Sequence, residues 1–488
     1  MASGTIHKNY HLLGLLILIY LVVFFKLDSF HMRWWDESMF AVNTYEMIHN
    51  GKYFSLYYDG VPDLFNTKPP LNSWLQMMFV KVIGYNELAI RLPSAIASGL
   101  TILLLFNFIS KNYSILLAWL SVLILLTSYG FIGFHTARTG DSDSLLTFFL
   151  FSANIYFLKF ILDNNKKHIF IFFVFISLAF ATKMYAALLF APAYLIILIQ
   201  NKQTKEFILN KYFALGVFLF LLSSVGLVYL REMGTPGYIQ QIIFKDAGRI
   251  FSVVENHSGS PIFYLENLFK TRFSIWAVLL IVGSVFAFFI ENKSDKKLLI
   301  NLLILSLTYF IVISSSTTKL EWYDMPLYPL LSIIAAYPLF VLLKNFNPTT
   351  VQFNSQKQLV FIVFIFFFYP FYMMFDKSQG NTIPNGEKIL EANERFIFKR
   401  HKEKKDLNGL KVYYSGYNGS LLFYKYKLSD KNQKIELNNS GQFNLNDKVL
   451  VSNDSLINQL KNKYEFSVID KFEKAQLILI NKLLYPNQ

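Results

Sequence analysis

Two adjacent carboxylates, Asp36 and Glu37, come at the end of the first long apolar run, within a long polar segment over residues 28–86. Ionisable groups at a membrane boundary are costly, and they commonly mark a substrate path. One carboxylate beside a hydroxyl group can take its proton, while a second can orient that base or raise its pKa. The simpler alternative is that the pair only marks the aqueous end of a helix.

Lys68 is the next residue with a chemical pattern, because Pro69 and Pro70 follow it directly. Two prolines fix the local backbone and keep the preceding residue extended. A rigidly presented ammonium suits a phosphate leaving group, which gains negative charge as its bond to carbon breaks. The alternative for so short a pattern is an ordinary turn.

Arg138 and Asp143 lie in a short polar stretch after the third apolar run. A guanidinium can bind a carboxylate or a phosphate through two parallel hydrogen bonds. The alternative is a solvated helix start that Asp143 caps. Lys183 stands between two apolar runs, where we expect it to snorkel to the interface, with phosphate binding as the other option.

The later polar stretches supply Arg249, His257, Lys319 and Tyr323. Arg249 is a candidate for binding an anion, whereas a lone loop histidine such as His257 is usually neither a base nor a metal ligand. Lys319 adds positive charge, and Tyr323 adds a hydroxyl donor. An aromatic belt at the membrane interface is the alternative, and it explains Trp322 better than Lys319.

The elements that must position these residues are apolar runs, most of them long enough to cross a bilayer as helices. Residues 168–200 could form one long helix or two short helices that meet around Thr182 and Lys183. With two helices there, the runs lie at 10–27, 87–110, 114–131, 144–162, 168–183, 185–200, 212–230, 273–290, 298–315, 325–343 and 359–375.

The segments between these runs alternate in character. Short basic segments, such as 202–211 and 344–357, are typical of cytoplasmic loops. The other set contains the candidate residues named above, so an alternating path places them all on the opposite face of the membrane. Such convergence favours one shared active site outside the cytoplasm.

Near residue 376 the composition becomes richer in Asn, Lys, Asp and Ser. Short apolar runs at 410–414, 448–451 and 476–480 predict strands, and residues 454–463 predict a helix. We therefore expect a membrane domain over 1–375 and a small α/β domain over 376–488. An odd number of spans places the second domain on the same face as the candidate site.

Composition limits the class of protein. The chain has 488 residues, of which 54% are hydrophobic, in long runs that indicate a polytopic membrane protein. The formal charge of +14 fits basic cytoplasmic loops, so nucleic acid is not an expected partner. The sequence contains no cysteine, which excludes disulfides and thiolate zinc sites. No small-residue cleavage site follows the first run, which favours an uncleaved span.

The order and spacing of these stretches resemble the polyprenyl-phosphate-dependent glycosyltransferases. That group includes the lipid A aminoarabinose transferases and, more distantly, the protein O-mannosyltransferases. The resemblance covers residues 34–343 and rests on seven short stretches, at 36–52, 67–71, 86–93, 137–143, 182–183, 249–264 and 319–329.

The resemblance implies a GT-C fold, which is a mainly α, polytopic membrane helical bundle, here with about 11 transmembrane helices. It places the active site at the outer membrane–water boundary. Asp36 matches the family's catalytic base, and Glu37 and Asp143 are further catalytic candidates. The residues that the resemblance assigns to the donor phosphate are Lys68, Arg138, Arg249, Lys319 and Tyr323.

The implied reaction moves a sugar from a polyprenyl-phosphate donor to an envelope acceptor, with inversion, at a bacterial-type inner membrane. Lipid A, another glycolipid and a protein hydroxyl are all open as acceptors. Some members carry an acidic residue before the lysine that could bind metal. Thr67 stands there, which argues against a metal at that position, and a divalent metal elsewhere stays open.

Two other functions are compatible with some of these features. An O-antigen ligase or polymerase also uses polyprenyl-linked sugars. A transporter of lipid-linked sugars should place paired polar groups at mid-bilayer, often on broken helices in repeated halves. The polar groups here instead gather at one face, which favours transfer.

Overall fold

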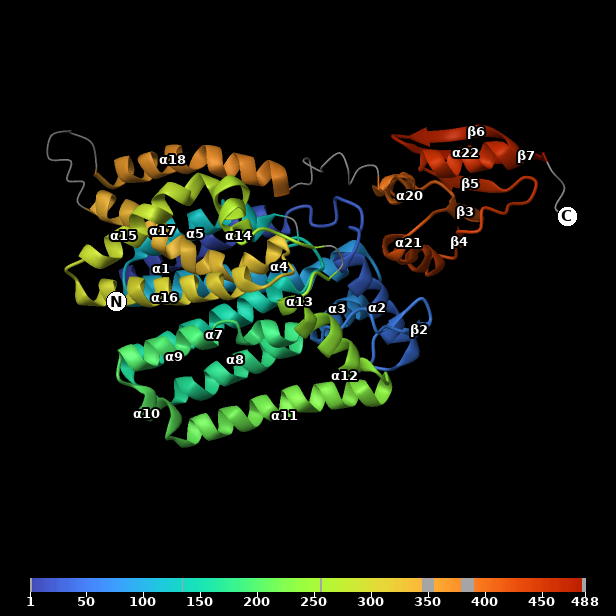
Figure 1. Cartoon of the computed structure of the whole chain (residues 1–488). Helices are drawn as coiled ribbons and strands as arrows, with labels where there is room; N and C mark the ends of the chain where they lie inside the picture. The colour runs from blue at the N-terminus through green and yellow to red at the C-terminus, as the bar shows by residue number, and fades with distance from the viewer. Residues whose placement is uncertain (1, 134, 255–256, 345–354, 379–389, 485–488) are drawn as a thin grey trace. The chain divides into compact units, whose positions relative to one another are not determined.

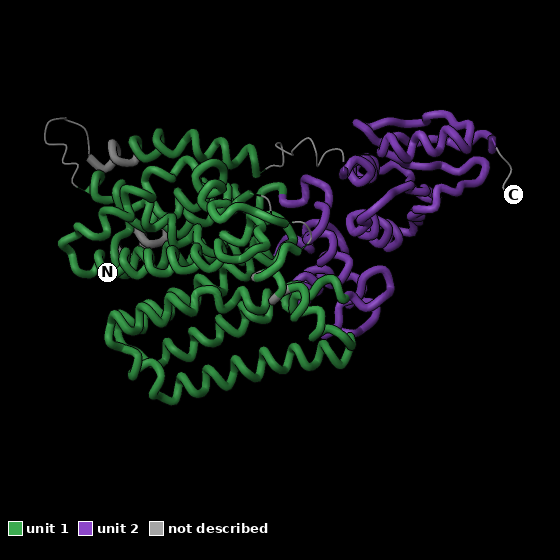
Figure 2. The backbone as a smooth tube through the Cα atoms, viewed as in Figure 1, with its two compact units in different colours: residues 1–26, 64–72, 93–379 green, residues 27–63, 73–92, 380–488 purple. Residues whose placement is uncertain are grey.

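The computed structural model describes residues 2–133, 135–254, 257–344, 355–378 and 390–484. The chain forms two compact units, coloured separately in Figure 2. The first, here the helical unit, comprises residues 1–26, 64–72 and 93–379. The second, here the mixed unit, comprises residues 27–63, 73–92 and 380–488.

The helical unit consists almost entirely of apolar helices (Figure 1). Helix α4 (Glu87–Asn112) begins in the mixed unit and continues into this one. The other helices are α1 (Ala2–Ile19), η1 (Tyr20–Phe24), α5 (Ile115–Leu126), α6 (Tyr129–Ile132), α7 (Asp143–Asp163), α8 (Lys167–Lys183), η2 (Met184–Leu188), α9 (Ala191–Gln200), α10 (Thr204–Ile208), α11 (Lys211–Gly234), α12 (Tyr238–Gln241), η3 (Ile242–Ala247), α13 (Gly248–Phe251), α14 (Phe263–Asn267), η4 (Leu268–Arg272), η5 (Ser274–Trp276), α15 (Ala277–Phe289), α16 (Lys293–Ser315), η6 (Glu321–Leu327), α17 (Tyr328–Lys344) and α18 (Ser355–Ser378).

All eleven predicted apolar runs are helical, but they differ in length. Among the described residues, seven helices are long and apolar enough to cross a membrane. An eighth span is formed if Phe263–Arg272 and Ser274–Phe289, which meet at an angle of 91°, count as one. The runs that begin near residues 10, 114 and 185 form shorter apolar helices, Tyr10–Phe24, Ile115–Leu126 and Ala191–Gln200. Length alone therefore supports fewer spans than the eleven predicted.

The structure divides residues 168–200 into two helices, as the sequence allowed. Helix α8 ends at Lys183, and Met184 adopts the left-handed backbone region with φ 42°. A single 3-10 turn, η2, follows before α9 begins, with a proline in its first turn. A proline at that position lacks the N–H that would continue the preceding helix, so the break is built into the sequence.

The mixed unit combines helices with a five-stranded sheet of order β4-β3-β5-β7-β6. Strand β3 runs parallel to β4 and β5, whereas β7 is antiparallel to β5 and β6. The sheet strands are β3 (Leu410–Tyr413), β4 (Ile435–Asn438), β5 (Lys448–Val451), β6 (Tyr464–Phe472) and β7 (Ala475–Leu483), and the remaining elements are the β1 (Tyr57–Tyr58) and β2 (Val61–Pro62) hairpin and the helices α2 (Asp36–Asn50), α3 (Leu71–Ile83), α20 (Ala392–Lys402), α21 (Gly419–Ser429) and α22 (Asp454–Lys463).

The three predicted strands and the predicted helix are present as β3, β5, β7 and α22. The sequence did not reveal β4 or β6. Strand β6 lies at the sheet edge and is mostly exposed, and its sequence mixes charged with apolar residues. Charged side chains are normal on an edge strand, but they weaken the alternating pattern by which strands are recognised.

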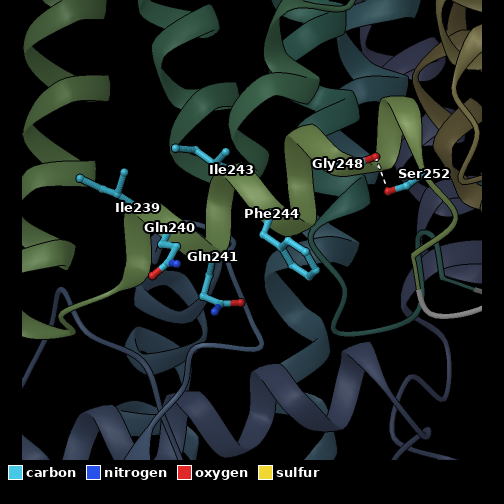
Figure 3. A pocket seen from close by; sticks show the side chains of 7 residues that line it. All are labelled: Ile239, Gln240, Gln241, Ile243, Phe244, Gly248 and Ser252. Atoms are coloured by element: carbon cyan, nitrogen blue, oxygen red, sulfur yellow. Dashed lines mark hydrogen bonds between the residues drawn. The ribbon is translucent and has the colours of Figure 1, made fainter.

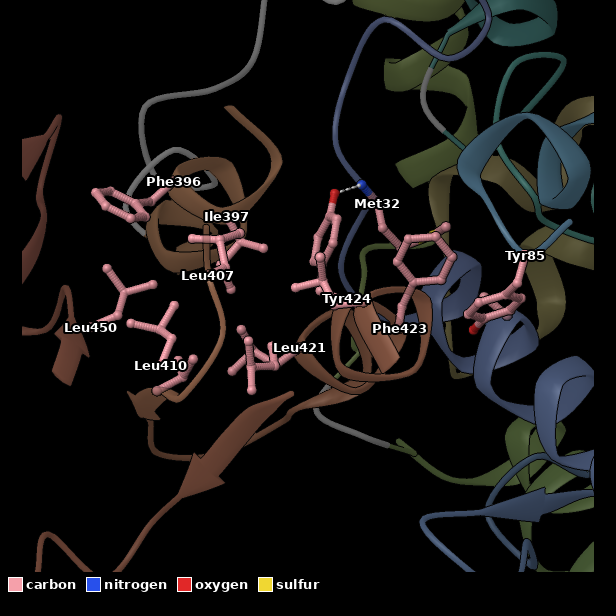
Figure 4. Packing of buried hydrophobic residues seen from close by; sticks show 14 of the residues in the cluster. Met32, Tyr85, Phe396, Ile397, Leu407, Leu410, Leu421, Phe423, Tyr424 and Leu450 are labelled. Carbon is pink, nitrogen blue, oxygen red and sulfur yellow. Dashed lines mark hydrogen bonds between the residues drawn. The ribbon is translucent and has the colours of Figure 1, made fainter. Parts of the chain in front are cut away.

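One core joins the two parts of the mixed unit that are distant in sequence. Met32 and Tyr85 from the first polar segment pack in one buried cluster with Phe423 and Tyr424 of α21 (Figure 4). The Tyr424 hydroxyl also accepts a hydrogen bond from the Met32 backbone N–H at 3.0 Å. The C-terminal sheet and the first polar segment thus fold as one body, whereas the sequence suggested a division near residue 375.

Candidate active site

Asp143 is the first residue of α7, and its carboxylate is bound to a lysine. The Lys183 ammonium donates to its Oδ1 at 2.6 Å; the Asp143 side chain is buried, and the Lys183 side chain is partly buried. A carboxylate in the first turn also interacts favourably with the positive end of the helix. Lys183 therefore does not snorkel to an interface as expected, because its ammonium is directed into the protein to meet Asp143.

The same lysine connects Asp143 to two other predicted residues. Its ammonium lies 4.8 Å from the centre of the Tyr323 ring, within the range of a cation–π contact. The Tyr323 hydroxyl in turn accepts a hydrogen bond from Arg249 at 2.5 Å. We call Asp143, Lys183, Arg249 and Tyr323 the anion cluster, because together they form a candidate binding site for an anion. Two cations and one carboxylate give it a net charge of +1, which suits a negatively charged ligand.

A loop after α16 fixes the helix turn that presents Arg249. The Thr318 N–H and the Ser316 hydroxyl both donate to the Arg249 carbonyl, at 3.0 and 2.9 Å. The Thr318 hydroxyl donates to the carbonyl of Ser252 at 2.8 Å. Helix α13 has only four residues, so these contacts, and not its own hydrogen bonds, hold the guanidinium toward Tyr323.

Lys68 is presented by a segment that an arginine and a tyrosine hold in place. Arg231, at the end of α11, donates to the backbone carbonyls of Lys68 and Asn66 and lies over the Tyr238 ring. The Tyr238 hydroxyl donates to the Thr67 carbonyl at 2.7 Å and lies 3.7 Å from the Met184 sulfur. Since Met184 follows Lys183, one tyrosine links the lysine segment to the anion cluster.

A cavity of about 780 Å³ lies along α12, η3 and α13 (Figure 3). Its lining is mainly apolar, with two glutamines, and Gly248 and Ser252 form its far end; the other lining residues are Ile239, Gln240, Gln241, Ile243 and Phe244. Gly248 and Ser252 lie on either side of Arg249 in the sequence. The cavity thus combines an apolar lining with a cation-bearing helix turn at one end, as a ligand with an apolar tail and an anionic head would require.

Arg138 has a different environment from the anion cluster. Its guanidinium is buried and donates to the carbonyls of Val22 and Val23 at 3.1 and 2.9 Å. It also donates to the carbonyls of Phe25 and Lys26 at 2.9 and 3.2 Å. These carbonyls lie at the end of η1 and in the turn that follows it, where a helix leaves its last carbonyls without partners of its own. Arg138 therefore closes the end of that helix.

Lys319 is likewise directed at backbone carbonyls. Its ammonium donates to the carbonyls of Ser314 and Ser316 at 2.7 and 2.5 Å, at the end of α16. Burial lowers the pKa of this ammonium, because the charged form loses contact with water. Its N–H donates to the His257 carbonyl at 3.0 Å, so Lys319 also ties the loop after α13 to the end of α16.

Asp36 and Glu37 begin α2 in the mixed unit but have different surroundings. Glu37 is fully buried, and its two oxygens accept from Arg91 at 2.7 and 3.0 Å. Glu37 also accepts the Arg33 N–H at 2.8 Å. Asp36 is partly exposed at the start of the helix, where the unpaired N–H groups favour a carboxylate. Of the two, Asp36 is the more accessible, whereas Glu37 is enclosed in its ion pair with Arg91.

Some residues of the site did not stand out in the sequence. Arg231 follows an apolar run directly, and a charge at that boundary is the signal that would have selected it. His135 and Asp141 form a pair at 3.2 Å, and the His135 ring stacks on Trp322 with centroids 3.8 Å apart. These two are side chains of the metal-ligating type.

Comparison with known proteins places this geometry in context. Residues 67–229 match the family described as dolichyl-phosphate-mannose-protein mannosyltransferase, a segment that includes Lys68, Asp143 and Lys183. An uncharacterized protein of Aquifex aeolicus is 27% identical over 66% of this chain and 63% of its own length. The undecaprenyl phosphate-alpha-4-amino-4-deoxy-L-arabinose arabinosyl transferase of Pseudomonas savastanoi is 30% identical over 26% of this chain and 24% of its own.

The fold has a full-length match among solved structures. The crystal structure of ArnT from Cupriavidus metallidurans bound to undecaprenyl phosphate aligns over 98% of both chains, with a TM-score of 0.70 and 16% identity. The chain is thus a multi-pass membrane protein with the GT-C fold, and parts of it are similar in sequence to an arabinosyl transferase and to the mannosyltransferase family. The resemblance and the fold class expected from the sequence are confirmed.

Proposed function

We propose that this relative of the GT-C glycosyltransferases moves a sugar from a polyprenyl-phosphate donor to an envelope acceptor at the outer face of the membrane. The observation that carries the proposal is the anion cluster, with Arg249 on the helix turn at one end of an apolar cavity. A polyprenyl phosphate has the matching parts, because its tail is apolar and its head is anionic.

The phosphate would meet Arg249, Tyr323 and the ammonium of Lys68 as it leaves. Positive charge and hydroxyl donors stabilise the negative charge that develops on a departing phosphate. Arg138 and Lys319 would serve this site indirectly, because their donors are bound to carbonyls at helix ends. Glu37 would position α2 through Arg91, and Asp143 would position Lys183.

The proposed base is Asp36, which is partly exposed at the start of α2 and matches the base of the family that the sequence resembles. The carboxylates of Glu37 and Asp143 are each held in an ion pair, with Arg91 and with Lys183. In the reaction, the acceptor hydroxyl gives its proton to Asp36, and its oxygen forms a new bond to the anomeric carbon. The bond from that carbon to the phosphate oxygen breaks with its electron pair, and polyprenyl phosphate leaves. Direct displacement of this kind inverts the anomeric carbon.

The test supplies purified protein with a polyprenyl-phosphate sugar and an envelope extract, and measures released polyprenyl phosphate. Asp36→Asn should reduce release by roughly 10²–10⁴-fold, as loss of a general base does. Arg249→Gln should weaken donor use by about tenfold or more, since a charge-assisted hydrogen bond is lost. Asp454→Asn and Lys270→Gln, which change exposed charges, should have wild-type rates.

Two results would count against the proposal. Wild-type turnover by Asp36→Asn would make Asp143 or Glu37 the better base. Movement of lipid-linked sugar across liposomes with no consumption of the donor would show transport in place of transfer.

A further inference from the structure

A cluster of stacked aromatic rings lies in the mixed unit, next in sequence to the proposed base. The Trp35 ring stacks on Tyr417 with centroids 4.5 Å apart and planes inclined by 16°. Trp34 meets these two rings edge-on, at 5.5 and 5.7 Å. Trp35 is nonetheless 46% exposed, which is unusual for so large an apolar ring that is held in fixed contacts.

Hydrogen bonds fix this arrangement. The Tyr417 hydroxyl and the Ser38 hydroxyl both donate to the Trp35 carbonyl at 3.0 Å. Trp35 has φ 62° and ψ −121°, a backbone region that residues with a Cβ atom rarely occupy. Strain of this kind persists only where the surroundings hold it, and it gathers at ligand-binding sites.

Polar groups border the rings. The Tyr58 ring lies 6.2 Å from Tyr417, and its hydroxyl donates to Asn418 Oδ1 at 2.8 Å. The Asn418 amide donates to the Tyr414 hydroxyl at 3.2 Å. An apolar ring face bordered by hydroxyl and amide groups matches a pyranose sugar, which has C–H bonds on one face and hydroxyl groups around its edge.

We propose that this aromatic platform, formed by Trp34, Trp35, Tyr58 and Tyr417, binds a sugar ring of the acceptor. The acceptor is then a saccharide, such as the head of a glycolipid, and not a protein hydroxyl. The assignment of this sugar ring to the acceptor rests on the proposed function. In that function the base must meet the acceptor hydroxyl, and Asp36 directly follows Trp35. The binding of a sugar ring by the platform does not depend on that function.

Anchoring in the membrane interface is the other common use of an exposed tryptophan. An anchor requires neither a ring stacked in one orientation nor a backbone held outside the usual regions. Hydrogen-bonded hydroxyl and amide groups around the ring would not strengthen the contact of such an anchor with lipid. These three features favour a sugar ring as the occupant of the platform.

Saturation-transfer difference NMR on the full-length protein in detergent tests the platform with no donor present. The probes are maltose and the disaccharide of N-acetylglucosamine. We expect ring C–H protons of at least one probe to receive saturation, and Trp35→Leu to weaken its binding by roughly tenfold. Trp35→Phe keeps an aromatic face and should retain part of the binding, which also shows that the substituted chain folds.

Phe54→Leu is the matched control. Phe54 is an exposed aromatic residue of the same unit that meets Trp74 edge-on at 5.5 Å, outside the platform. Its substitution should leave the binding of both probes unchanged.

Equal saturation transfer to wild type and Trp35→Leu, or none to either probe, would overturn the proposal. A second result would also overturn it. If brominated phosphatidylcholine in liposomes strongly quenched the tryptophan fluorescence of the wild type, and Trp35→Phe abolished that quenching, Trp35 would be a membrane anchor. The proposed function can fail separately. Trp35-dependent sugar binding without consumption of any polyprenyl donor would leave the platform intact and remove the transferase assignment.

Discussion

At the scale of single residues, the carboxylates of the predicted site differ in what they contact, and that difference separates their roles. Glu37 is paired with Arg91, and Asp143 is paired with Lys183. Sequence spacing selected these carboxylates together with Asp36 but could not rank them. Their ion-pair partners lie 54 and 40 residues away in the chain, so only the folded structure reveals which carboxylate is already neutralised.

The Asp143–Lys183 pair supports a first prediction. Lys183→Met should strongly destabilise the protein, because it leaves the Asp143 carboxylate buried without its counterion, a loss of about 3–5 kcal/mol in comparable pairs. Asp143→Asn in the same chain should restore part of the loss, because no buried charge is then unpaired. Thermal unfolding in detergent of the two single variants and the double variant measures the coupling between them.

Lys159→Met is the comparison for that cycle, since it removes a lysine of α7, whose ammonium contacts the Tyr156 ring at 4.6 Å. Additive losses in the double variant would show that Asp143 and Lys183 do not stabilise each other. Donor affinity should also fall in Lys183→Met, since the ammonium lies against the Tyr323 ring.

At the scale of helices and strands, the sequence was most informative where apolar runs are long. The runs that form α7, α11 and α16 were located to within a few residues. An apolar helix must match the thickness of the bilayer, so its length and its composition both mark where it begins and ends. The role of Arg138 could not be predicted in this way. Its partners are carbonyls at the irregular end of the first helix, and no sequence pattern marks which carbonyls lack a partner.

Arg138→Lys tests that structural role. A lysine has one ammonium and cannot reach four carbonyls in two directions, so some of them lose their donor in a buried place. An unsatisfied buried polar group costs roughly 1–3 kcal/mol, and the unfolding temperature should fall accordingly. The affinity for polyprenyl phosphate, measured on folded protein below that temperature, should change little.

A loss of phosphate affinity in Arg138→Lys as large as that in Arg249→Gln would instead support the phosphate role that the family resemblance implies for Arg138. Arg231→Lys offers a useful contrast, because Arg231 also donates to backbone carbonyls but holds the Lys68 segment. It should lower both stability and donor affinity.

At the scale of the whole chain, the sequence predicted the sheet of the mixed unit but not the composition of its core. A change in composition near residue 376 correctly predicted a sheet, but not that residues 27–63 and 73–92 would share its core. Buried polar pairs also connect these stretches, with Lys427 donating to Glu87 at 2.5 Å and His31 lying 2.7 Å from Glu391. Such pairs join residues more than 330 positions apart, and a single sequence contains no record of them.

The placement of the chain across the membrane is the last prediction, and the proposed chemistry depends on it. Basic segments favour the cytoplasmic side, so the segments around Lys205 and Lys293 should lie there, with the mixed unit on the opposite side. The chain has no native cysteine, so a maleimide can label only the single cysteine that is introduced. In intact spheroplasts, an impermeant maleimide should label Val61→Cys and Lys431→Cys, both exposed, and should label Lys205→Cys and Lys293→Cys only after permeabilisation. The reverse pattern would place Asp36 in the cytoplasm, away from an acceptor on the outer face, and the proposed transfer could not occur as written.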